Sequence, residues 1–137
     1  MMTPCQKTLC ENGEALFSVV LGLETFGFGG SMAKVNQYMI ANGGYNADCS
    51  VNWAVMNGLN FAHFDSETTT AGYFQLCSWA RRHYIVVAKY HDANHTARAG
   101  LVVQCDDLGN FLLRDGTGRR QMLSFLRKES FLVFFGL

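Results

Sequence analysis

The first half of the chain alternates apolar runs with polar or glycine-containing breaks, at the spacing expected of helices. Ser31 suits a helix cap, and the glycines at 27–30 and 43–44 suit helix ends. The segment near 49–58 is apolar on two faces, which is typical of a central helix packed on both sides. The pattern predicts four helices, over residues 11–23, 32–41, 49–58 and 66–80.

After Arg81 the pattern changes to short runs rich in β-branched and aromatic residues, which favour strands. Residues 106–110 are typical of a hairpin turn, and residues 120–126 form an amphipathic segment. Strands are expected over 83–90, 101–105, 111–115 and 131–135. Helices followed by an antiparallel sheet indicate an α+β fold, and no repeat or linker divides the 137 residues into more than one domain.

The composition excludes several classes of function. Eleven basic residues balance eleven acidic ones, without the basic block expected of a nucleic-acid-binding protein. The apolar run from Ala15 to Leu23 is too short to span a bilayer and lacks the flanks of a signal peptide. We therefore expect no membrane insertion and a cytoplasmic location at synthesis.

The five cysteines match no disulfide framework, because their number is odd and their spacing irregular. We expect a reducing environment, with Cys5 and Cys10 as the one local pair in question. Cys77 and Cys105 are interpreted as core residues.

Cys49 stands at the junction of a polar loop and the predicted helix 49–58. Unpaired backbone N–H groups and the helix dipole stabilise a thiolate at such a position, although a buried structural cysteine is the alternative. A cysteine nucleophile needs a base and a group that orients it. If residues 106–110 form the turn, Asp115 lies roughly across from residue 100, with His95 at the same end of the sheet. His83 is the alternative base.

The sequence contains two weaker candidate sites. His91 and His95, with Cys105 or Cys77, offer ligands of the kind that zinc prefers, but their spacing falls in an expected loop. Residues 27–34 resemble a phosphate loop poorly, since no strand precedes them and the Lys-Ser/Thr ending is missing. We expect no metal and no cofactor.

The order of these motifs resembles papain-like cysteine hydrolases over residues 45–137. A cysteine opens a helix in Asp48-Cys49-Ser50, a histidine precedes a strand at His95, and Asp115 ends a strand before a glycine turn. The second half is similar to bacteriocin-processing peptidases. The first half is similar to NlpC-type cell-wall amidases.

The resemblance implies a papain-like core over 31–137, in which a central helix packs on a small antiparallel sheet, and residues 1–30 form an N-terminal extension and helix. It implies Cys49 as nucleophile, His95 as base and Asp115 as the orienting group, with Gln37, Asn42 or Asn46 completing an oxyanion hole. The predicted function is cleavage of an amide bond in a peptide or protein substrate. A peptidoglycan amidase or a protein deamidase effector, delivered outside the cell by a non-classical route, is one alternative. A non-catalytic binding or inhibitor protein is the other.

Overall fold

The protein is described here by a computed structural model that covers residues 4–47, 50–82, 84–115 and 119–136. The α-helices are α1 (Pro4–Glu24), α2 (Met32–Ala41) and α3 (Tyr73–Arg81), and two 3-10 helices are η1 (Trp53–Leu59) and η2 (Phe125–Arg127). The strands are β1 (Ala62–Thr68), β2 (Tyr84–His91), β3 (Ala97–Cys105), β4 (Asn110–Arg114), β5 (Arg120–Ser124) and β6 (Ser130–Gly136). Within the described residues this is an α+β architecture, as predicted.

The six strands form one sheet in the order β1-β6-β2-β3-β4-β5, and all neighbouring strands are antiparallel. Because β6 lies between β1 and β2, the last strand of the chain joins two strands that come much earlier in the sequence. The β3–β4 ladder pairs Leu101 with Arg114. This register places residue 115 level with residue 100, which confirms the predicted alignment of these two positions.

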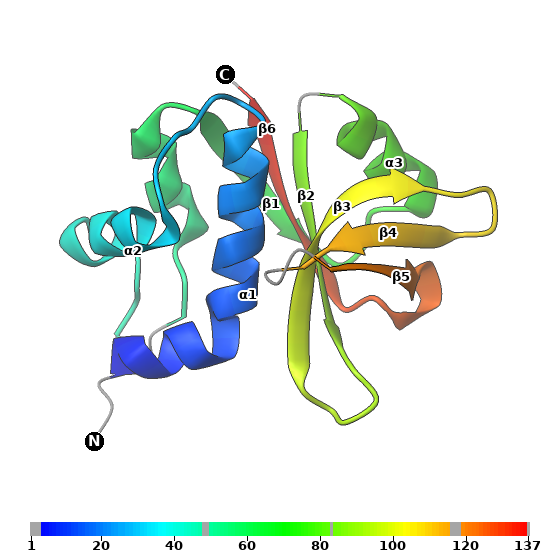
Figure 1. The fold of residues 1–137 in the computed structure, drawn as a ribbon, viewed down its shortest axis with the longest axis horizontal. Coiled ribbons are helices and arrows are strands. Elements are labelled where there is room, and N and C mark those ends of the chain that lie inside the picture. The colour runs from blue at the N-terminus through cyan, green and yellow to red at the C-terminus, as the bar shows by residue number, and fades with distance from the viewer. Residues whose placement is uncertain (1–3, 48–49, 83, 116–118, 137) are drawn as a thin grey trace.

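Helix α1 packs on one face of the sheet, against β2 and β3 (Figure 1). Its apolar run is buried, with Val19 fully enclosed and Leu16 and Leu23 nearly so. Gly22 allows the close approach, because a Cβ there would lie 2.6 Å from a Cγ of Ile85. The helix predicted over 11–23 is thus part of α1, which supplies the long helix that covers the sheet.

The predicted central helix over 49–58 is not formed as such. Val51 instead bridges to Tyr45 in extended backbone, and the helix that follows is the seven-residue η1. It ends at Leu59, because Asn60 follows with a positive φ of 63° and donates its N–H to the Asn57 carbonyl. The side-chain oxygen of Asn57 accepts a hydrogen bond from the β1 backbone N–H of Phe64 at 2.7 Å and so joins η1 to β1. The predicted helix 32–41 is confirmed as α2, capped by Ser31.

The predicted helix over 66–80 was wrong in its first part. Residues 62–68 form the edge strand β1, with alternately enclosed and exposed side chains, and α3 begins only at Tyr73. The polar residues His63, Asp65 and Glu67 fall at every second position on the exposed side of this strand. No helix in the described part of the chain is long and apolar enough to cross a membrane.

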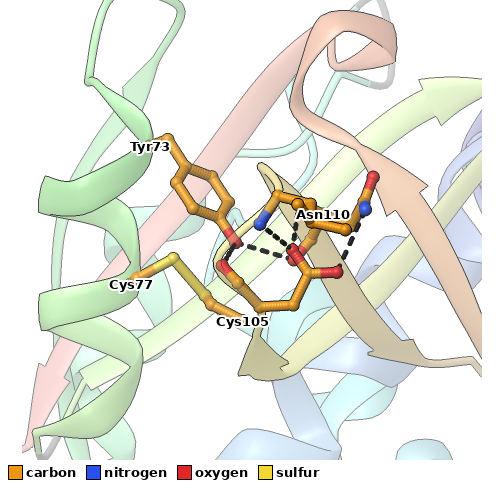
Figure 2. The surroundings of a disulfide bond; sticks show 6 residues. Tyr73, Cys77, Cys105 and Asn110 are labelled. Atoms are coloured by element: carbon orange, nitrogen blue, oxygen red, sulfur yellow. Dashed lines mark hydrogen bonds between the residues drawn. A yellow bond between two sulfur atoms is a disulfide. The ribbon is translucent and has the colours of Figure 1, made fainter.

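Helix α3 covers the other face of the sheet and is joined to it by a disulfide between Cys77 and Cys105, with Cα atoms 6.0 Å apart (Figure 2). Cys77 is a core residue and Cys105 packs against the same cluster, as predicted, but the bond between them was not predicted from the sequence. Beside the disulfide, the Tyr73 hydroxyl lies 2.6 Å from the Asp106 carbonyl oxygen and 2.8 Å from that of Asn110. Burial, and secondarily the Asp106 carboxylate, raises the pKa of Tyr73.

Candidate functional site

The predicted nucleophile Cys49 and the alternative base His83 lie outside the described residues. The three oxyanion candidates lie in or after α2. Gln37 is exposed on that helix, and the side-chain amide of Asn42 donates to the Tyr38 carbonyl at 2.8 Å as part of the helix end. Asn46 donates to the Ser50 hydroxyl at 2.9 Å within the loop. The catalytic and oxyanion roles of these residues stay predictions.

His95 lies in the exposed turn between β2 and β3. Its backbone has a positive φ of 59°, and its N–H donates to the Asp92 carbonyl at 3.0 Å. The Asp92 carboxylate organises this turn by accepting from the backbone N–H groups of Thr96 and Asn94 at 3.0 and 2.9 Å. These bonds, that of Thr96 first, lower the pKa of Asp92. The turn is therefore built around Asp92, with His95 as an exposed part of it.

Asp115 follows β4 and is buried, with 3% of its surface exposed. The Asp115 N–H donates to the Arg119 carbonyl, and the Asp115 carboxylate accepts from the Arg119 N–H at 3.1 Å. The ladder register puts Asp115 level with Gly100, three residues, or about 10 Å, along β3 from its first residue, Ala97. His95 precedes Ala97 in the chain and is therefore even further along the strand direction from the position opposite Asp115.

Arg98 is the residue of β3 whose side chain reaches Asp115. Its Nη2 lies 3.8 Å from an Asp115 oxygen, and its Nη1 lies 3.6 Å from the Asp92 carboxylate. Its Nε donates to both carboxylate oxygens of Glu14 in α1, at 2.8 and 3.0 Å. One guanidinium thus joins α1, the β2–β3 turn and the end of β4. We refer to Glu14, Asp92, Arg98 and Asp115 as the Arg98 cluster.

The hydrogen bond that Arg98 donates to the Glu14 carboxylate, followed by the negative charge of that carboxylate, raises the pKa of Arg98. The guanidinium therefore remains a fixed cation at every pH at which the protein folds. Its side chain and those of Glu14 and Asp92 are about a third exposed, whereas that of Asp115 is enclosed. The cluster accordingly presents charge to solvent above a buried carboxylate.

Tyr90 lies directly across the β2–β3 ladder from Arg98 and extends the cluster inward. The side-chain amide of Gln121 on β5 donates to the Tyr90 hydroxyl. Burial raises the pKa of Tyr90, while the nearby Arg98 acts in the opposite direction. A cavity of about 40 Å³ opens beside Tyr90, Arg98 and Glu14, which is room for very few water molecules.

Sequence reasoning missed Arg98, because the strand was predicted to begin only at residue 101. A signal was available in the segment Ala97-Arg98-Ala99-Gly100, where one cation stands among small residues just before an apolar strand. The alternative zinc site has no thiolate ligand from Cys77 or Cys105, since these two cysteines form a disulfide with each other. His91, its first proposed ligand, contacts the carboxylate of Glu129.

No family model matches the sequence, and no curated protein matches it. Among solved structures, the chain is similar to the peptidase domain of Streptococcus ComA, described as a bi-functional ABC transporter involved in a quorum-sensing pathway. The TM-score is 0.58 at 10% sequence identity, and the match covers 93% of this chain and 92% of that one. The likeness is one of fold, and it agrees at that level with the predicted resemblance to peptidases. It includes most of α1, which the predicted resemblance had left out.

Proposed function

We propose that this chain is a peptide-binding protein on a peptidase fold, without hydrolytic activity of its own. The observation that carries the proposal is the position of Arg98, whose guanidinium lies 3.8 Å from the Asp115 carboxylate. A Cys-His-Asp hydrolase needs an imidazole beside its orienting aspartate. The fold likeness to a peptidase domain supports a peptide or protein as the bound partner.

The chemical argument depends on proton transfer. A cysteine hydrolase removes the thiol proton with an imidazole and later returns that proton to the leaving amine. A guanidinium has no lone pair available for this purpose, and Glu14 holds its pKa above the usual range. Arg98 can bind and orient carboxylates or carbonyl oxygens, but it cannot act as the base.

The reactivity of the cysteines tests the absence of catalysis. The native protein, with its disulfide intact, is treated with iodoacetamide at pH 5.5 to 9, and alkylation of Cys5, Cys10 and Cys49 is followed by peptide mass spectrometry. Each rate is expected to rise with pH around an ordinary thiol pKa of about 8.5. Rapid alkylation of one cysteine at pH 6, lost in His95→Ala and kept in the exposed-strand control His63→Ala, would refute the proposal.

Binding is tested on a peptide array with Lys-rich and Glu-rich octapeptides. The Arg98 cluster contains three carboxylates and one guanidinium, so we expect the native protein to prefer cationic peptides. Glu14→Gln should weaken that preference, whereas Glu24→Gln, at the other end of α1, should leave it unchanged. Equal binding by all three proteins would contradict a peptide site at the cluster.

The second candidate is the predicted cysteine hydrolase, and the observation in its favour is the peptidase fold itself. In this case Cys10 is a second nucleophile to test beside the predicted Cys49. Cys10 is within α1, the helix that packs on the sheet. The alkylation experiment separates the two cysteines directly, because each is in a different peptide after digestion.

A further inference from the structure

A second candidate site lies away from the Arg98 cluster, between α2, η1 and the loop that joins α1 to α2. It is a cavity of about 430 Å³, within the range of small-molecule sites. In Figure 1, α2 lies on the side of α1 that is away from the sheet. The cavity is therefore on the opposite side of α1 from the β-strands that hold the Arg98 cluster.

The cavity is lined mainly by apolar and aromatic side chains. The rings of Phe28 and Phe61 meet edge to face, with centroids 5.2 Å apart, and Val35 is fully buried beneath. Tyr38 reaches across from α2 to η1. A Cβ at Gly58 would overlap its hydroxyl, so the absence of a side chain there permits this position.

Lys34 is the single charged residue among the described residues that line this cavity. Its side chain is exposed, and within the described part of the chain no carboxylate forms an ion pair with it. Other cations of the protein differ in this respect, since Lys89 pairs with Glu67 and Arg98 with Glu14. An aromatic cavity with an unpaired ammonium at its edge complements a molecule that is apolar at one end and anionic at the other.

We infer that this cavity binds a small apolar carboxylate, with its ring or branched chain between Phe28, Phe61 and Tyr38 and its carboxylate toward Lys34. The site is independent of the proposed peptide binding, because none of its lining residues belongs to the Arg98 cluster.

The test uses 3-phenylpropanoate as the probe and ligand-observed NMR titration of the full chain. Replacing Lys34 by Met should weaken binding about fivefold, which is the effect of losing one partly exposed ion pair. The neutral probe 3-phenylpropanamide should bind the native protein as weakly as the acid binds Lys34→Met. The matched control Lys128→Met removes a cation from the residue that follows η2, which does not line the cavity, and should leave the affinity unchanged.

A second variant, Leu59→Trp, adds volume at the cavity wall and should abolish binding while circular dichroism shows an intact fold. Equal affinity of the native protein, Lys34→Met and Leu59→Trp would overturn the inference. A tetrapeptide ending in Phe that binds tenfold more tightly than 3-phenylpropanoate would overturn the free acid as occupant and assign the cavity to the end of a peptide.

Discussion

Removal of the disulfide should destabilise the protein by an amount that follows from the length of chain it closes. Cys77 and Cys105 are 28 residues apart, and closing a loop of this size in the unfolded chain corresponds to about 3.6 kcal/mol at 25 °C. For a chain of 137 residues this is equivalent to a fall of about 12 °C in Tm. The perturbation is Cys77→Ala with Cys105→Ala, since alanine adds no polar group to the buried face of α3.

The free energy of unfolding is measured by urea titration of the native protein and the double variant, each with and without the reductant TCEP. TCEP should lower the stability of the native protein to nearly that of the double variant, and it should leave the double variant unchanged. The second comparison controls for Cys5, Cys10 and Cys49. A native protein whose unfolding free energy changes by less than 1 kcal/mol on reduction would refute the reasoning.

Three further outcomes follow from other contacts. Arg98→Met should lower the free energy of unfolding by about 2 kcal/mol in urea titration, because the buried Asp115 carboxylate loses the guanidinium 3.8 Å away, and an unchanged midpoint would contradict this. Tyr73 should ionise above pH 10, later than exposed tyrosines, so its contribution to stability is full below pH 10 and falls as the pH rises further. The difference between the 295 nm pH titration curves of the native protein and Tyr73→Phe measures this ionisation, and a midpoint of the difference curve below pH 10 would count against it. Gly22→Ala should be less stable than Gly13→Ala by about 1–3 kcal/mol, since only Gly22 is pressed against the sheet, and equal thermal midpoints would show that α1 is not packed so closely.

Local signals were sufficient where a segment's own residues decide its conformation. Helix α2 was predicted with its correct bounds, because Ser31 caps it and Asn42 with the following glycines ends it. The alignment of residues 100 and 115 was also obtained, because a short turn fixes the register of the hairpin that it closes.

The sequence was less informative where distant contacts decide the outcome. Segment 49–58 has the apolar spacing of a helix, but Val51 bridges to Tyr45 and the helix that follows is only η1. The pairing of Cys77 with Cys105 depends on α3 crossing β3, which no local pattern reveals.

The candidate site shows the same limit. Asp115 was found because it ends a recognisable strand, whereas Arg98 required the true start of β3 and the presence of α1 beside it. The role of His95 as a base stays a prediction, and the structure places the guanidinium of Arg98 3.8 Å from Asp115.

The placement of β6 has a consequence for how the protein is made. Strand β6 lies between β1 and β2 and pairs with both. In a nascent chain that has left the ribosome only as far as β5, strand β1 therefore has no β6 to pair with. Its apolar face then stays open to chaperones or to other chains until Ser130–Gly136 emerges. Completion of the sheet is thus delayed until nearly the whole of this sequence has been translated, and ribosome stalling upstream of residue 130 should leave a protease-sensitive intermediate.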